Sequence, residues 1–203
     1  MTSTTLVRER VYDPVLRSLH AWNGSMVLLL LASGQVIPMV GFGADTAVPW
    51  TLHTWLGYGL LMGLYARLVW GLVGPRHARW TALWHPTAWV DALSRRRFFV
   101  APQAFGHHPL ASGAYLVVYG LLMIMLATGL ALAAIDWNTG PLYAWFGHDV
   151  MLKAYARLPH EAIGYLLILF LGAHLAALVL HPRRHGVPVA QAMVSGYQYL
   201  KEK

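Results

Sequence analysis

Four long stretches of the chain are almost free of charge, and they constrain the fold more than any other feature. They cover residues 15–37, 52–73, 110–135 and 159–180. A helix rises about 1.5 Å per residue, so each stretch is long enough to cross a hydrocarbon layer about 30 Å thick. Charged residues make up only 11% of the chain, against about 25% in soluble domains. The sequence therefore predicts an all-α integral membrane protein, a single domain over residues 1–203 with a bundle of four transmembrane helices.

The basic residues are distributed unevenly between the two ends of these stretches. Thirteen of the fifteen Lys and Arg residues lie in the N-terminal segment, the second-to-third connection and the C-terminal tail, or at Arg67. The two opposite loops hold only Lys153 and Arg157. Because basic residues gather on the cytoplasmic side of membrane proteins, we expect both termini in the cytoplasm. The basic clusters are short and lie between apolar stretches, so the expected surface partner is membrane lipid and not nucleic acid.

Histidine is the residue type that points to chemistry in this chain. Cysteine is absent, which excludes disulfides, thiolate metal sites and covalent attachment of a c-type haem. Any metal must then be held by histidine or carboxylate, and the chain has eleven histidines.

Four of the histidines lie within the apolar stretches or at their ends, and they form two pairs at matched depth. His20 and His174 belong to the cytoplasmic side, and His53 and His160 belong to the outer side. Each pair joins two different helices, as bis-histidine ligation of a haem requires. His160 and His174 are fourteen residues apart, which places them near one face of a helix and about 21 Å apart. We therefore predict two haems within the bundle, with His181 as the rival to His174.

Glycines accompany three of these histidines at a fixed spacing. Four residues after His20, His53 and His160 stand Gly24, Gly57 and Gly164. Position i+4 lies one turn away on the same helix face, and a porphyrin beside a helix needs that turn to be bare. The alternative interpretation is that the glycines serve helix packing. Gly34 lies fourteen residues after His20, at the depth of the outer histidine pair, and is expected to make room for the haem on that side.

Two arginines and one loop complete the candidate features. Arg67 lies near the cytoplasmic end of the second stretch, on the same stripe as His53, and an intramembrane Arg normally faces a partner. Haem propionates or a quinone headgroup would neutralise it, and Arg17, one turn before His20, could serve likewise. In the loop before the fourth stretch we expect a short amphipathic helix around Tyr143 to Ala156, a candidate docking segment.

These residues resemble the bacterial di-haem cytochrome b family, which includes the b-type cytochrome subunits of membrane-bound nickel–iron hydrogenases. The resemblance covers essentially the whole chain, and it rests first on the order and spacing of the four histidines. Supporting stretches are Val11 to His20, His53 to Tyr58, Arg67 to Gly71, Gly106 to Leu110 and Met193 to Tyr197. The last of these is similar to the hydrogenase cytochromes in particular. His108 departs from the family pattern, in which we expect Asn.

The resemblance implies two b-type haems and a protein of the bacterial inner membrane. Their ligands would be His20 and His174 on the cytoplasmic side, and His53 and His160 on the periplasmic side. It implies electron transfer between a periplasmic redox partner, a hydrogenase-like dehydrogenase or a c-type cytochrome, and the membrane quinone pool. Quinone reduction is the expected reaction at this subunit, and a homo-oligomer is left open.

The quinone region is expected near the cytoplasmic haem, with Gly106 and His108 as its candidate residues. Two other functions compete with the electron-transfer subunit. One is a free-standing quinone-coupled oxidoreductase, such as a superoxide oxidase. The other is a haem-free, histidine-lined transporter of metal ions or protons, which predicts a colourless protein.

Overall fold

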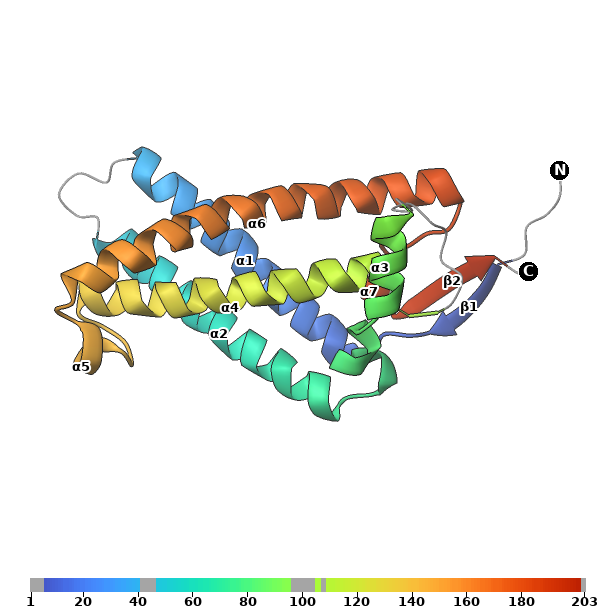
Figure 1. Cartoon of the computed structure of the whole chain (residues 1–203), viewed down its shortest axis with the longest axis horizontal. Helices are drawn as coiled ribbons and strands as arrows, with labels where there is room; N and C mark the ends of the chain where they lie inside the picture. Colours follow the sequence, from blue (N-terminus) through green and yellow to red (C-terminus); the bar gives the residue numbers. More distant parts are fainter. Residues whose placement is uncertain (1–5, 41–46, 96–104, 107–108, 202–203) are drawn as a thin grey trace. The chain divides into compact units, whose positions relative to one another are not determined.

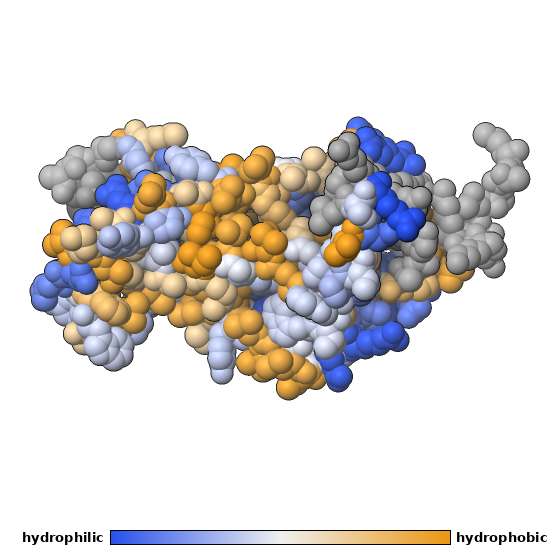
Figure 2. Space-filling model, viewed as in Figure 1, coloured by the Kyte–Doolittle hydropathy of each residue, from blue (hydrophilic) through white to orange (hydrophobic). Residues whose placement is uncertain are grey.

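The computed structural model describes residues 6–40, 47–95, 105–106 and 109–201. Within these residues, four helices are long and apolar enough to cross a membrane. They are α1 (Pro14–Val40), α2 (Ala47–Val73), α4 (Pro109–Trp137) and α6 (Val150–His185) (Figure 1). Apolar residues remain exposed on their surfaces, as expected for helices surrounded by hydrocarbon (Figure 2). The prediction of four long apolar helices is confirmed.

The start of the fourth long helix corrects one expectation. α6 begins at Val150, nine residues before Pro159, where the fourth stretch was expected to open. The carboxylate of Asp149 accepts a hydrogen bond from the backbone N–H of Leu152 at 2.9 Å, and such an N-cap bond starts a helix. The amphipathic helix expected from Tyr143 to Ala156 is therefore wrong. Only α5 (Tyr143–Phe146) is separate, and Val150 onward belongs to α6.

The chain divides into two compact units, and each long helix contributes one part to each of them. The first unit comprises residues 1–21, 65–117 and 172–203, and the second comprises residues 22–64 and 118–171. The first holds thirteen of the fifteen basic residues of the sequence.

The core of the second unit is built from parts of all four long helices. Its buried residues come in pairs four positions apart on α2, α4 and α6, which puts both members of a pair on one helix face. They are Leu60 and Leu64, Leu122 and Leu126, and Ile163 and Leu167. Met26, Val27, Leu30 and Leu31 of α1 pack against them. The second unit is therefore a packed four-helix arrangement.

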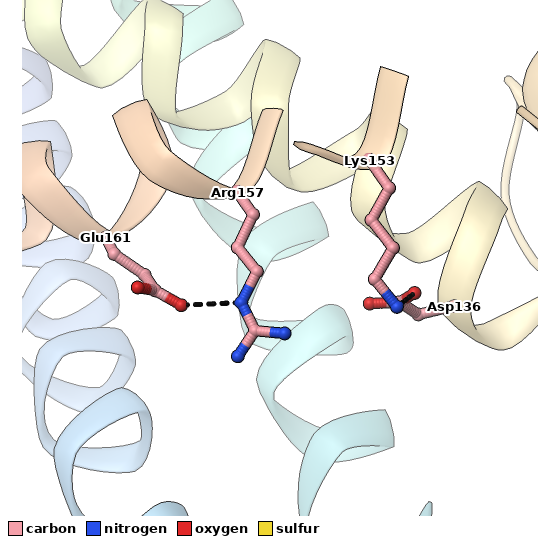
Figure 3. A network of polar contacts seen from close by, with 4 residues as sticks. All are labelled: Asp136, Lys153, Arg157 and Glu161. Atoms are coloured by element: carbon pink, nitrogen blue, oxygen red, sulfur yellow. Dashed lines mark hydrogen bonds and ion pairs between the residues drawn. The ribbon is translucent and has the colours of Figure 1, made fainter. Parts of the chain in front are cut away.

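Two ion pairs account for both basic residues of the second unit (Figure 3). Lys153 Nζ lies 2.5 Å from Asp136 Oδ1 and connects α6 with the end of α4. Arg157 Nε donates to Glu161 Oε1 at 2.8 Å, one turn along α6. Such partly exposed pairs contribute little to stability. They balance the positive charges of Lys153 and Arg157 within this unit.

The first unit contains a two-stranded ribbon that the all-α prediction did not include. β1 (Leu6–Arg10) pairs antiparallel with β2 (Tyr197–Lys201), so the N- and C-terminal segments lie together (Figure 1). The turn before β2 is made by Gly196, whose φ of +86° favours glycine. Its carbonyl accepts hydrogen bonds from the N–H groups of Val11, at 2.9 Å, and Tyr12, at 3.1 Å.

Short helices complete the first unit. The connection after α2 forms two 3₁₀ turns, η1 (Arg76–Ala78) and η2 (Trp80–Leu83), followed by α3 (Pro86–Ser94). The segment after α6 forms α7 (Ala192–Ser195). Val11, Tyr12, Leu16, Ala78 and Ala192 form the core of this unit.

Candidate functional site

The second unit brings His53 and His160 together from different helices. His53 lies on α2 and His160 on α6, and the centroids of their rings are 6.5 Å apart with an angle of 70° between the ring planes. The Nδ1 atom of each ring has a hydroxyl partner on a neighbouring helix. Ser33 Oγ of α1 lies 2.8 Å from His53 Nδ1, and Thr128 Oγ1 of α4 lies 2.9 Å from His160 Nδ1.

The first unit brings His20 and His174 together in the same way. His20 lies on α1 and His174 on α6, and their ring centroids are also 6.5 Å apart, with an angle of 47° between the planes. The rival residue His181 is seven positions further along α6, which is a rise of about 10 Å. Only one of the two can stand at the level of His20, and the structure places His174 there.

The separation within each pair fits a metal held between two imidazoles. With metal–nitrogen bonds of about 2 Å and ring bonds of about 1.3–1.4 Å, the two centroids would be about 6.3 Å apart. Both observed separations, 6.5 Å, are close to this value. The ring planes can rotate about the metal–nitrogen bonds, so angles of 47° and 70° are both compatible with such a complex.

Each pair offers only two ligands, which limits the kind of metal group it could hold. Among the residues that the structure describes, no three His, Asp or Glu side chains gather closely enough to bind a metal ion. A bare metal ion held by two imidazoles would lack most of its coordination sphere. An iron that brings four in-plane nitrogens of its own, as in haem, needs two axial ligands from the protein. The donor set therefore fits a haem better than a bare metal ion.

The glycines one turn from the histidines border open space. A Cβ atom added at Gly24, Gly57 or Gly164 would meet no other atom within 4 Å. Gly164 is nevertheless buried. By contrast, a Cβ at Gly59 would lie 2.9 Å from Met26 Sδ, which is what a helix-packing glycine shows. Close contact with a neighbouring helix therefore does not explain Gly24, Gly57 and Gly164. Of the three, Gly24 is exposed, and their role beside a haem stays a prediction.

Two other glycines lie directly beside the histidine rings. A Cβ at Gly34 would be 3.6 Å from His53 Cε1, and a Cβ at Gly129 would be 3.1 Å from His160 Cε1. Gly34 was expected to make room for the outer ring, and it lies against the imidazole itself. Gly129 and its neighbour Thr128 were missed by the sequence reasoning. The dipeptide Thr128-Gly129 repeats the hydroxyl–glycine order of Ser33-Gly34. The same order also occurs at Ser112-Gly113, Thr139-Gly140 and Ser195-Gly196, so the sequence alone did not single it out.

The two arginine candidates have different surroundings. Arg67 is only 4% exposed, and its guanidinium carbon lies 4.3 Å from the centroid of the Trp80 ring. A buried cation on a membrane-spanning helix suits an anionic group. Arg17 instead donates from Nε to the carbonyl of Met193 at 3.2 Å and from a second nitrogen to the carbonyl of Val194. This structural role in holding the C-terminal segment was not predicted, and its cofactor role stays a prediction.

The candidate quinone residues are described only in part. Gly106 has a φ of +111°, and its N–H donates to Gln198 Oε1 at 2.8 Å. Gln198 Nε2 donates to the carbonyl of Gly106 and to the hydroxyl of Tyr12. Burial raises the pKa of that Tyr12 hydroxyl well above its ordinary value, so the group stays neutral. His108 lies outside the described residues.

We expect Gly164→Leu to reduce the haem content from two groups per chain to one, because the new side chain would fill the space one turn from His160. The matched control is Gly120→Leu. Gly120 also borders open space, but it is exposed, and its helix α4 carries none of the four histidines. The measurement is a pyridine haemochrome assay on both purified variants. Equal haem content in the two variants would contradict a role for Gly164 in making room for the ring.

Four long apolar helices that carry two histidine pairs, each at the separation of a bis-imidazole iron complex, define a multi-pass membrane protein of the b-type cytochrome class. The chain belongs to the prokaryotic cytochrome b561 family, whose model matches residues 11–196. This match confirms the family resemblance drawn from the histidines. It makes membrane electron transfer with haem b the general function of the chain.

Two curated relatives carry the same description, "probable Ni/Fe-hydrogenase B-type cytochrome subunit". The protein of Azotobacter chroococcum mcd 1 is 24% identical over 221 residues, and that of Azotobacter vinelandii is 25% identical over 222 residues. Each comparison covers 95% of this chain and 89% of the relative. No solved structure matches the chain significantly.

Proposed function

We propose that this chain binds two b-type haems and transfers electrons between a periplasmic redox partner and the membrane quinone pool. The observation that carries the proposal is the pair of matched sites, His20 with His174 and His53 with His160, each with ring centroids 6.5 Å apart. A bound haem supplies reversible one-electron oxidation and reduction of its iron. The four histidines would hold the two groups, and the remaining residues would set their surroundings.

The donor set favours electron transfer over reaction with a small substrate. With an imidazole on each side, neither metal would have an open position for oxygen or another ligand. The four histidines lie on helices long and apolar enough to cross a membrane, so the surroundings of the bound groups would be poor in water and ions. The residues around each pair therefore suit a group that exchanges electrons without binding substrate.

Each histidine pair would hold the haem that carries electrons on one side of the membrane. We propose that the second unit faces the periplasm and that the first faces the cytoplasm, because the first holds thirteen of the fifteen basic residues. Both termini would then be cytoplasmic, in one transmembrane domain of a bacterial inner membrane. His160 and His174 are fourteen residues apart on α6. This helix would therefore contribute one ligand to the haem on each side of the membrane.

The names of the relatives support the proposed redox partner, and the buried guanidinium of Arg67 supports the proposed quinone region. The names of the two Azotobacter proteins favour a hydrogenase-like dehydrogenase as the periplasmic donor, with a c-type cytochrome as the other choice. Quinone reduction would take place in the first unit, where the buried guanidinium of Arg67 could face a propionate or a quinone oxygen. Gly106 and His108 belong to the proposed quinone region.

Haem counting and quinone reduction test the proposal. We expect the purified chain to be red, to give two haem b groups per chain in a pyridine haemochrome assay, and to be re-oxidised by a soluble quinone after reduction. A colourless protein would contradict it and favour a haem-free transporter. Rapid quinone reduction by superoxide, with no partner protein present, would favour the free-standing oxidoreductase.

A further inference from the structure

We propose that two hydroxyl–glycine dipeptides, Ser33-Gly34 on α1 and Thr128-Gly129 on α4, position His53 and His160 as iron ligands through Nε2. We call each dipeptide a histidine clamp. The inference rests on the proposed function, because it assumes that this pair of histidines binds a haem. It goes further by assigning a role to residues that neither bind the metal nor belong to the histidine pattern.

The hydrogen bonds around each clamp suit a proton on Nδ1 of the imidazole. The hydroxyl proton of Ser33 has an acceptor in the carbonyl of Leu30 at 3.1 Å, which leaves Oγ able to accept from His53 Nδ1 at 2.8 Å. The hydroxyl proton of Thr128 has acceptors in the carbonyls of Ile124, at 2.8 Å, and Met125, at 3.1 Å, so Oγ1 can likewise accept from His160 Nδ1. The clamp assigns the proton of both imidazoles to Nδ1, and the lone pair on Nε2 is then left for a metal.

The glycine of each clamp lets the ring approach the helix. Gly34 and Gly129 directly follow the hydroxyl residues, and their Cα positions face the Cε1 atoms of the two rings, next to Nδ1. A side chain at Gly129 would press on His160, since its Cβ would lie only 3.1 Å from Cε1. At Gly34 the corresponding distance of 3.6 Å is an ordinary contact. The Thr128-Gly129 clamp therefore holds the Nδ1–Cε1 edge of His160 by hydrogen bonding and by shape, and the backbone of Met125 adds a hydrogen bond to this ring. The Ser33-Gly34 clamp acts on His53 mainly through its hydrogen bond.

The same order of residues occurs on two helices that are distant in sequence, against two histidines of one pair. Ser33 and Thr128 are ninety-five positions apart, and each follows the dipeptide Leu-Ala. An imidazole N–H that is removed from water without an acceptor carries a desolvation cost. A hydrogen bond from Nδ1–H also makes Nε2 a stronger donor to the metal. That stabilises ferric iron relative to ferrous iron and lowers the reduction potential.

The test uses Ser33→Ala, Thr128→Ala and the double variant in the full chain. We expect the midpoint potential of the outer haem, the one lost in His53→Ala, to rise in each variant and most in the double variant, while the inner haem is unchanged. The low-spin ferric signal of the outer haem in electron paramagnetic resonance should shift as well. Ser33→Thr and Thr128→Ser keep a hydroxyl and should retain the wild-type potential. If the double variant loses the outer haem and the hydroxyl-retaining variants keep it, the clamp is also supported.

Thr54→Ala is the matched control. Thr54 is next to His53, but its hydroxyl donates to the carbonyl of Trp50 on its own helix, so we expect no change in either potential. A double variant with wild-type potential and spectrum would overturn the clamp while leaving the two-haem proposal intact. An equal shift of both haems would also overturn it, because the effect would then be a general loss of packing. A wild-type chain without haem would instead overturn the proposed function, and the clamp with it.

Discussion

Replacing His53 or His160 with Ala should remove one and the same haem and leave the other bound. The centroids of the two rings are 6.5 Å apart, so both residues would hold the same haem, and the loss of either would remove one of its two protein ligands. The haem content should fall from two groups per chain to one in each variant. In a redox titration of the purified proteins, the same component should be missing from both.

A histidine outside the two pairs provides the control for this experiment. His148 lies in the loop before α6, with its ring near Tyr143, and His148→Ala should keep both haems. The pairing would be wrong if the His53 and His160 variants lost different redox components. It would also be wrong if either variant kept two haems with unchanged potentials.

Replacing His20 or His174 with Ala should remove the other haem, and His181→Ala should leave both in place. The physical reason is the rise of a helix. His174 and His181 are about 10 Å apart along α6, and it is the ring of His174 that lies 6.5 Å from the ring of His20. The haem content should fall to one group per chain in the first two variants and stay at two in the third. The redox component that remains should be the one lost in the His53 variant.

His181 is the sharpest comparison because it lies on the same helix and in the same unit as His174. A His174→Ala protein with two haems, together with a His181→Ala protein with one, would assign the ligand to His181. Loss of both haems from the His20 variant would show that the two sites do not form independently.

Much of the architecture could be predicted because membrane-spanning helices have a simple pattern. A run of about twenty residues with almost no charge can only cross the membrane as a helix, since backbone groups in hydrocarbon must bond within their own segment. Matching the depths of histidines along these runs was enough to pair His20 with His174 and His53 with His160. The structure brings these same residues together.

Features that depend on a polar contact between distant segments were not predicted. The ribbon of β1 and β2 requires the two ends of the chain to meet, and neither strand has an apolar alternation that would reveal it. Asp149 starts α6 earlier than Pro159 suggested, because one capping hydrogen bond decided the position. The hydrogen bonds from Arg17 to two backbone carbonyls of the C-terminal segment were likewise not predicted. The cofactor role expected of Arg17 stays a prediction.

By itself, then, the sequence determined the four helices, the uneven distribution of charge and the histidines that share a depth. Each of these depends only on position along a single helix. Because a helix has a constant rise per residue, that position can be calculated from the residue number. The tertiary structure alone decided that Ser33 and Thr128 lie within hydrogen-bond distance of the imidazoles of His53 and His160 and that Gly34 and Gly129 lie against these rings. Those contacts depend on how each helix is rotated toward its neighbours. That rotation is set by the packing of the whole core and has no signature in any one stretch.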